Sequence, residues 1–184
     1  MNKKDSLEKI NNEILLCKIC KIDSIGVAVV GEGNPDADVM FIGEAPGKLE
    51  AETGRPFVGR SGQLLRGLIR DAGLKEEDVY ITSPVKYLPK RGTPDSRQIA
   101  HGRGHLLKQI EVIKPKLIVL LGRVAAEGVL QKKVFVAKEH GEVIEEKNGA
   151  KYFLTYHPAA ALRFPKKLKP FLTADFKKIK FLFA

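Results

Sequence analysis

The sequence predicts an α/β fold, a three-layer α/β/α sandwich around a central, mainly parallel, four-stranded sheet. Four short apolar runs recur along the chain, at 38–42, 79–83, 117–121 and 152–155. Segments with helical apolar spacing lie between them, and strands that alternate with helices favour parallel pairing. A chain of 184 residues, 43% of them apolar, suits one domain of ordinary size, expected to span 1–184.

The first half of the chain is assigned from apolar spacing and turn residues. Leu7, Ile10 and Ile14 recur three or four residues apart, as on one face of a helix. Gly73 is a helix stop, and uninterrupted apolar runs indicate buried strands. The expected elements are a helix over 4–16, a short strand over 27–30, a strand over 38–42, a helix over 62–72 and a strand over 79–83.

The second half continues this alternation. The segment LPKRGTPD is rich in proline, glycine and basic residues, which is typical of a loop. The expected elements are that loop over 88–95, a helix over 97–113, a strand over 117–121, a short helix over 125–130, two short strands or a hairpin around Gly141 within 134–147, a strand over 152–155 and a helix over 174–183.

Charge indicates the class of partner. The formal net charge is +10 and the pI is near 9.6, which favours a polyanion, nucleic acid first. A soluble protein from a lysine-rich proteome is the alternative. No apolar run approaches the roughly 18–20 residues that span a bilayer, and the charged N-terminus has no signal-peptide core. We therefore expect no membrane contact and a cytoplasmic protein, and without an oligomer signal we expect a monomer.

Turns at strand ends carry the candidate chemistry. Gly43, Ser83, Gly122 and His157 each follow a predicted strand. In open parallel sheets, ligands bind outside the carboxyl ends of the strands. We therefore expect these turns to surround one site.

The segment GEAPG, residues 43–47, directly follows a strand. Gly43 and Gly47 allow unusual backbone conformations, so the turn can aim N–H groups at a ligand. Glu44 is then placed to orient water or to face a developing cation. The alternative is an ordinary turn with a solvated Glu44. The segment matches neither GxxxxGK[ST] nor GxGxxG.

Two further segments offer aromatic, basic and histidine side chains. In GRPFVGRSG, Phe57 is suited to stacking on a planar ring, and Arg55 and Arg60 to binding phosphates; Phe57 as a plain core residue is the alternative. In YHPAAAL, His157 is placed to donate a hydrogen bond to an oxygen that gains negative charge, or is a structural histidine. Arg163 and Lys166 then begin a basic, DNA-facing loop, or a solvated charge run.

These segments together resemble the uracil-DNA glycosylase superfamily, closest to its family 4, the thermostable iron–sulfur type. GEAPG, GRPFVGRSGQLL, VYIT-x-x-VK, LIVLLG and YHPAAAL occur in the family's order, and the resemblance covers roughly residues 5–182. It implies a three-layer domain that flips a uracil or other damaged base out of DNA and hydrolyses its N-glycosidic bond.

The resemblance also implies residue roles. Glu44, in the turn that begins at Gly43, would position water or stabilise the sugar cation. Ala45 would offer its backbone to the base, Phe57 would stack on it, and His157 would stabilise the leaving anion. Leu162 and Arg163 would hold the DNA open from the minor-groove side.

One departure concerns base recognition. Ser83 stands where the family has an asparagine that reads the base edge as donor and acceptor. A serine is shorter and has a single hydroxyl. Uracil is the first expectation, and hypoxanthine or another deaminated or damaged base is the alternative. A catalytically weak member that senses damaged bases in DNA is a second hypothesis. A nucleotide-binding α/β protein is a third, which the missing phosphate loop disfavours.

The second departure concerns metal. The family holds a [4Fe–4S] cluster with four cysteines, and only Cys17 and Cys20 are present, with Tyr87 and about Gly102 at the other two positions. Two thiolates are too few for that cluster. His101 and His105, four residues apart on one helix, complete a Cys2His2 set of zinc type. We hypothesise that zinc, or no metal, replaces the cluster. Surface histidines and reduced cysteines are the alternative.

Overall fold

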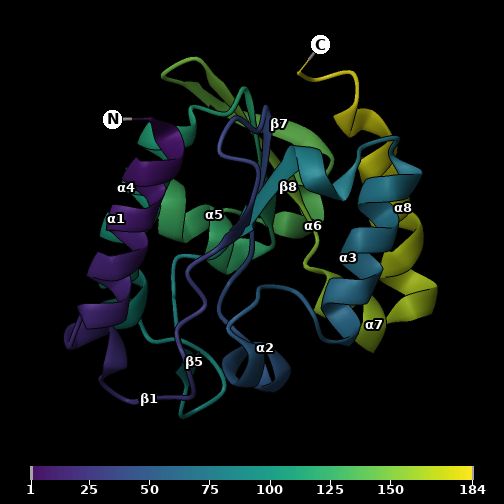
Figure 1. The fold of residues 1–184 in the computed structure, drawn as a ribbon. Helices are drawn as coiled ribbons and strands as arrows, with labels where there is room; N and C mark the ends of the chain where they lie inside the picture. Colours follow the sequence, from purple (N-terminus) through teal and green to yellow (C-terminus); the bar gives the residue numbers. More distant parts are fainter. Residues whose placement is uncertain (1, 184) are drawn as a thin grey trace.

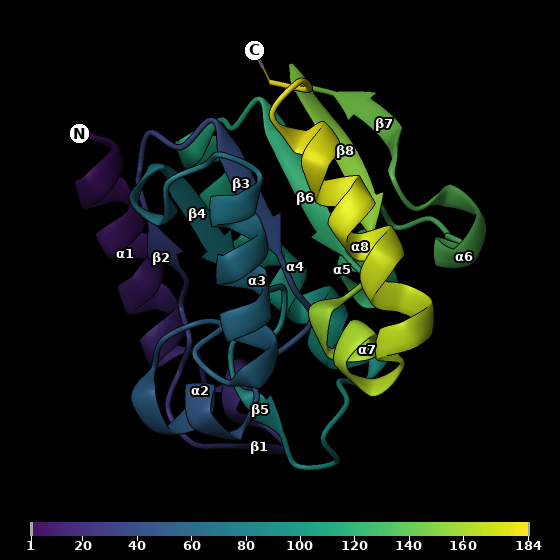
Figure 2. The same cartoon turned by 90° about the vertical axis from the view of Figure 1, so that its right-hand side faces the viewer.

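The central sheet has six strands, and the computed structural model that shows it describes residues 2–183. Its order is β2-β4-β3-β6-β8-β7, seen face-on in Figure 2. The four inner strands are mutually parallel and the two edge strands are antiparallel to their neighbours. The strands are β2 (Glu32–Gly33), β3 (Val39–Ile42), β4 (Val79–Thr82), β6 (Leu117–Leu121), β7 (Glu142–Lys147) and β8 (Ala150–Thr155).

Helices cover both faces of this sheet, which confirms the three layers (Figure 1). One layer contains α1 (Lys3–Leu16), α4 (Ser96–Ile113) and α5 (Arg123–Leu130). The other contains α3 (Arg60–Asp71), α7 (Pro158–Arg163) and α8 (Pro165–Ile179). Within the described residues, none of the helices is long and apolar enough to cross a membrane.

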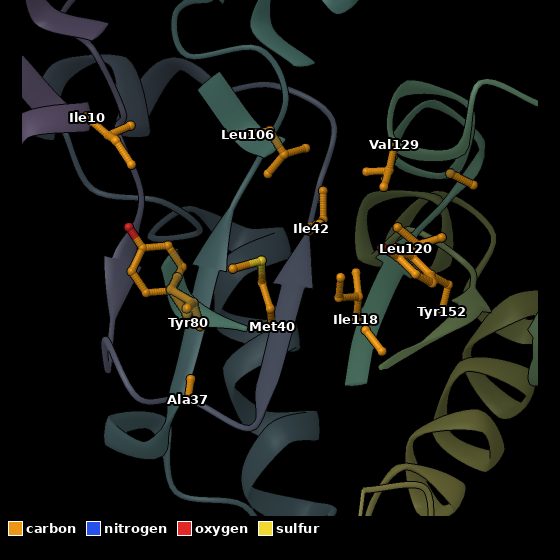
Figure 3. Close-up of a cluster of buried hydrophobic side chains, with 14 of the residues drawn as sticks. Ile10, Ala37, Met40, Ile42, Tyr80, Leu106, Ile118, Leu120, Val129 and Tyr152 are labelled. Carbon is orange, nitrogen blue, oxygen red and sulfur yellow. The ribbon is translucent and has the colours of Figure 1, made fainter. Parts of the chain in front are cut away.

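The strand register divides the apolar residues between the two layers. Met40 lies opposite Tyr80 on one side and Ile118 on the other, and these three pack toward α1, α4 and α5 (Figure 3). The next residue, Phe41, lies opposite Ile81 and Val119 and packs toward α3 and α8. Because successive side chains on a strand point to opposite faces, an uninterrupted apolar run supplies both cores.

The remaining elements are short. A 3₁₀ turn (Ile19–Lys21) follows α1, and a second one (Glu76–Asp78) precedes β4. A separate two-stranded sheet joins β1 (Ser24–Ile25) to β5 (Leu88–Pro89). The helices α2 (Lys48–Thr53) and α6 (Val136–Glu139) complete the list.

The structure corrects the predicted sheet. The four predicted strands are its parallel centre, but β2 and β7 extend it to six strands. No strand occupies 27–30, and the predicted loop over 88–95 begins with β5. The hairpin lies between β7 and β8 rather than around Gly141. Its turn residues Asn148 and Gly149 both have positive φ, the Asn-Gly pattern of a tight two-residue turn.

The C-terminal helix is longer than predicted. It begins at Pro165, not at 174, and contains Pro170. Proline at the first position suits a helix, but proline in the interior removes a hydrogen bond and normally ends one. The prediction therefore started the helix after Pro170. The buried residues Leu168, Leu172 and Phe176 anchor the helix on the sheet on both sides of it.

Candidate active site

An open pocket of about 730 Å³ lies at the carboxyl ends of β3, β4 and β8. It is lined by residues from the turns after these strands and from the loop before α3. The sequence-predicted residues that line it are Glu44, Ala45, Phe57, Ser83, His157 and Arg163. Three of the four predicted strand-end turns therefore meet at one site, as expected for a parallel sheet, whereas Gly122, at the end of β6, is not among the lining residues.

Gly43 lies against the rings of Phe57 and His157. A Cβ atom at position 43 would be 2.6 Å from Cζ of Phe57 and 3.9 Å from Nε2 of His157. Gly43 is not among the positive-φ glycines, and Gly47 has a φ of −86°. The prediction that these glycines supply unusual backbone conformations is therefore wrong. Gly43 is required for close approach instead, because any side chain there would displace Phe57.

Phe57 forms one wall of the pocket in an unfavourable backbone conformation. Its φ is +51°, a region that L-residues with large side chains rarely adopt. Its ring centroid lies 5.8 Å from that of His157, with 29° between the ring planes. The two rings thus face the same space from elements a hundred residues apart.

Two charged side chains that the sequence analysis did not identify hold the Phe57 loop. The buried carboxylate of Glu50 accepts hydrogen bonds from the N–H groups of Val58 (2.9 Å) and Gly59 (2.8 Å). The guanidinium of Arg66 donates to the carbonyl oxygens of Phe57 and Pro56, both at 3.1 Å. These contacts fix the loop on both sides of the ring. Glu50 and Arg66 bind main-chain N–H and C=O groups, which nearly every residue type offers. The sequence of the loop therefore does not show which side chains hold it, and a motif alone could not identify either residue.

Replacing Glu50 with alanine should loosen this loop. Two partly buried N–H groups lose their acceptor, which costs about 1–3 kcal/mol of unfolding free energy. We expect single-turnover cleavage of the uracil substrate that the resemblance implies to fall about tenfold through the misplaced ring. Urea unfolding and single-turnover kinetics measure the two effects. Glu50→Gln keeps one acceptor oxygen and is the control; an alanine variant with the wild-type rate would contradict the positioning role.

His157 is held in one tautomer at the start of α7. Its Nδ1 accepts a hydrogen bond from the Ala159 N–H at 3.1 Å, and the residue is the N-cap of the helix. A neutral imidazole that accepts at Nδ1 carries its proton on Nε2. Burial lowers the pKa of His157 to about 4. At neutral pH the ring is therefore an uncharged donor, with Nε2 on the side of Gly43 and Phe57.

Glu44 is a partly buried carboxylate on the same pocket wall. Burial raises the pKa of Glu44, and the positive charge of Arg123 opposes part of that rise. A carboxylate with a raised pKa is a better proton acceptor at neutral pH than a solvated one. Glu44 thus combines a pKa above the ordinary value for glutamate with access to the pocket.

Ser83 is buried at the end of β4, where its hydroxyl donates to the carbonyl oxygen of Val85 at 2.8 Å. The proton is engaged within the protein, so the hydroxyl oxygen offers only lone pairs to the pocket. The preceding residue, Thr82, is also fixed, because its hydroxyl oxygen accepts from Nζ of the fully buried Lys86 at 2.8 Å. Burial lowers the pKa of Lys86 to about 7.

The predicted DNA-binding residues occupy different surroundings. Arg55 makes a two-bond ion pair with Glu32, with both distances 2.7 Å. Arg60 begins α3 and is exposed. Leu162, Arg163 and Lys166 are exposed on α7 and α8, and of these Arg163 lines the pocket. The prediction of a basic loop here is therefore wrong, because Arg163 ends α7 and Lys166 lies in the first turn of α8. Arg163 borders the pocket, whereas the Arg55 guanidinium is already paired with a carboxylate.

The four predicted metal ligands come together away from the pocket lining. Cys17 follows α1, Cys20 lies in the 3₁₀ turn, and His101 and His105 lie on α4. One potential ligand atom from each lies within 4.8 Å of all the others. At the third cysteine position of the family, Tyr87 is buried in the core. A Cβ atom on Gly102 would lie 2.1 Å from the carbonyl oxygen of Pro84. The residues present therefore do not fit a [4Fe–4S] cluster.

Comparison with known proteins shows the family to which the chain belongs. The model of the uracil DNA glycosylase superfamily matches residues 30–180. A Type-4 uracil-DNA glycosylase of Sulfurisphaera tokodaii is 42% identical over 190 residues, covering 96% of this chain and 84% of the relative. That of Thermotoga maritima is 38% identical, covering 97% and 95%. That of Archaeoglobus fulgidus is 38% identical, covering 95% and 92%. The chain belongs to the uracil-DNA glycosylase superfamily and, within it, to the type-4 family.

Proposed function

We propose that this chain is a monofunctional uracil-DNA glycosylase of base-excision repair, which hydrolyses the N-glycosidic bond of a base flipped out of DNA. The observation that carries the proposal is the meeting of three groups in one pocket: the Phe57 ring, the Nε2 donor of His157 and the Glu44 carboxylate. Each matches one need of the reaction, namely a stacking surface, a partner for the departing base and a group for water.

The base departs as an anion in the proposed reaction. The bond between the sugar C1′ and the base nitrogen breaks, and its electron pair goes to the base. The Nε2–H of His157 then donates to a base carbonyl oxygen as negative charge develops there. A neutral donor suits this task because it holds the anion without having to protonate it. Phe57 stacks on the base and keeps it in line with that donor.

Water completes the reaction at the sugar. The oxocarbenium-like sugar left at C1′ is attacked by a water molecule, which loses a proton on adding. Glu44 orients this water, accepts the proton and, as an anion, stabilises the positive sugar. Cleavage is dissociative and uses no lysine Schiff base. Gly43 and the Ala45 backbone form the pocket floor beneath the base.

The basic surface at the pocket rim is proposed to bind the DNA. Arg163 and Lys166 approach phosphates there, Arg60 contributes from α3, and Leu162 fills the space that the flipped base leaves. Arg55 is the weakest of these assignments, because its guanidinium would have to leave Glu32. A net charge of +10 predicts binding that weakens steeply with salt.

One assay tests the function. Oligonucleotides that carry uracil, hypoxanthine or xanthine, single-stranded or paired, are incubated with the protein and the abasic sites are cleaved. We expect abasic product from uracil, and Glu44→Ala and His157→Ala proteins serve as controls. Absence of abasic product from every substrate would overturn the enzyme assignment. Salt-sensitive DNA binding without excision would support the alternative, a weakly catalytic member that senses damaged bases.

Base preference should depend on Ser83. The Ser83 hydroxyl proton is engaged by Val85, so the residue can accept from a base N–H but cannot also donate to a base carbonyl. We expect Ser83→Asn to raise uracil excision about tenfold, since one added buried hydrogen bond contributes about 1–1.5 kcal/mol. Single-turnover rates on uracil and hypoxanthine measure the change. Ser83→Ala is the control and should lower both rates; an asparagine variant no faster on uracil would contradict this assignment.

We also propose that the chain acts as a single domain, as a monomer and in the cytoplasm. All the residues proposed for the reaction come from one chain, so the reaction described above requires no second subunit. Sedimentation equilibrium at several concentrations tests the monomer, and a mass of two chains would contradict it.

A further inference from the structure

We infer that Cys17, Cys20, His101 and His105 bind one Zn²⁺ ion, which joins the segment after α1 to α4 in place of the family's iron–sulfur cluster. The four residues come from two regions more than eighty positions apart in the sequence, and the glycosylase reaction proposed above uses none of them.

The geometry suits a single ion. All four ligand atoms lie within 4.8 Å of one another, and Cys17 Sγ lies 3.1 Å from His101 Nε2. Ordinary Zn–S and Zn–N bonds place the ligand atoms of a tetrahedral site about 3.3–3.8 Å apart. Small side-chain rotations bring the four into that range. The set has two thiols and two imidazoles, a combination common in structural zinc sites.

The local backbone presents the ligands in pairs. The Cys20 N–H donates to Cys17 Sγ at 3.5 Å, so the CxxC turn already folds around one sulfur. His101 and His105 lie four residues apart on α4 and therefore share one face, with ring centroids 5.5 Å apart. The two members of each pair are therefore already close together on one turn or one helix, so binding requires little rearrangement within a pair.

A second observation points to a missing ligand. Within the described residues, both ring nitrogens of His105 are buried and have no hydrogen-bond partner. Most buried polar atoms in proteins are paired, and an unpaired one costs about 1–3 kcal/mol. A metal ion at this position would bind one of these nitrogens directly. The missing partner of this nitrogen is therefore explained by a bound ion.

Iron–sulfur clusters fit these residues poorly. Only two thiolates are present, where a [4Fe–4S] cluster takes four. A two-iron cluster with cysteines on one iron and histidines on the other would separate the two pairs of ligands. Here Cys17 Sγ and His101 Nε2 are in direct contact instead. One zinc ion also balances the charge of two thiolates.

The ion has a structural task at this place. The segment that carries the cysteines buries little apolar surface, because Ile19 is 57% exposed and Ile22 is 59% exposed. Apolar packing alone therefore fixes this segment weakly to α4. Four coordination bonds would fasten it, and metal binding free energy then becomes folding free energy.

Metal analysis of protein made without a histidine tag tests the inference directly. We expect inductively coupled plasma mass spectrometry to give about one zinc per chain and no stoichiometric iron. A separate assay should find no stoichiometric acid-labile sulfide. Replacement of zinc by Co²⁺ should give the intense visible absorption of tetrahedral cobalt bound by thiolates. None of these readouts depends on excision, so failure of the zinc site is distinguishable from failure of the glycosylase assignment.

Variants assign the ligands. We expect Cys20→Ser and His105→Ala to lose most of the zinc and to melt at lower temperature than the wild type. His105→Cys, which keeps a ligand, should retain it. His140→Ala removes a histidine outside the cluster and should leave one zinc bound. Wild-type protein with no bound zinc after growth and dialysis in zinc-containing buffer overturns the inference. Iron with sulfide, or equal zinc in His105→Ala, also overturns it.

Discussion

Changing His157 to alanine is expected to lower the single-turnover rate of uracil excision by about 10²–10³-fold, the effect of removing one donor from a developing anion. The loss should appear in the rate of bond cleavage and much less in DNA affinity. The reason is that, in the proposed reaction, the Nε2–H of His157 interacts most strongly with the charge formed during cleavage. Phe57 and the basic rim, which are unchanged in this variant, would still hold the base and the DNA. Rapid-quench single-turnover kinetics with saturating enzyme measure the rate, and fluorescence anisotropy measures DNA binding.

The control for this prediction keeps a donor at the same position. His157→Gln retains an amide N–H of similar reach and should recover part of the rate lost in the alanine variant. Thermal unfolding of both variants checks that the cap of α7 survives, since Nδ1 also accepts from Ala159. A loss below tenfold in His157→Ala, in a folded protein, would show that the leaving base is stabilised by another group.

The acid side of the pH–rate profile is expected to follow Glu44. In the proposed reaction its carboxylate must be ionised to face the sugar cation and accept a proton. Burial raises the pKa of this carboxylate above the ordinary value for glutamate. The rate should therefore fall as the pH drops through this raised pKa. His157 does not contribute to that fall until lower pH, because its pKa is lowered to about 4. Single-turnover rates from pH 4.5 to 8.5 measure the profile.

Glu44→Gln is the matched variant for the profile. It keeps the shape of the side chain and removes the charge, so we expect a rate about 10²-fold lower and nearly independent of pH over the same range. An acid limb that persists in Glu44→Gln would assign the titration to a different group. An unchanged rate would remove Glu44 from the reaction.

The sequence predicts the centre of the fold better than its edges, for a physical reason. The central strands are buried on both faces, so β3 and β6 read as uninterrupted apolar runs. The edge strands lack this signal: β2 has two residues, and β7 is half-exposed and rich in glutamate. The β7–β8 turn did carry a signal, its Asn-Gly pair, which the prediction around Gly141 overlooked.

The residues of the site likewise fall into those that the sequence predicts and those that it does not. The positions of Glu44 and His157 follow from the rule that parallel strands end at one edge, and the structure places both at the pocket. The Phe57 ring could be located only by motif, because its loop is shaped by Glu50 and Arg66 through backbone contacts. Local patterns describe the side chain that touches a ligand more readily than the side chain that supports it.

The left-handed conformation of Phe57 has a consequence for the search along DNA. A glycosylase examines a great many normal bases for each damaged one. If the pocket has to order its side chains on binding, the free energy of that ordering is spent again for every base examined. Here the strain of the loop is compensated once, during folding, by Glu50, Arg66 and the packing of Gly62 against the Phe57 backbone. Because the Phe57 ring is already ordered before a base enters the pocket, no ordering cost is repeated for each base that is tested. The time that a base stays in the pocket then depends on how well it fits the pocket.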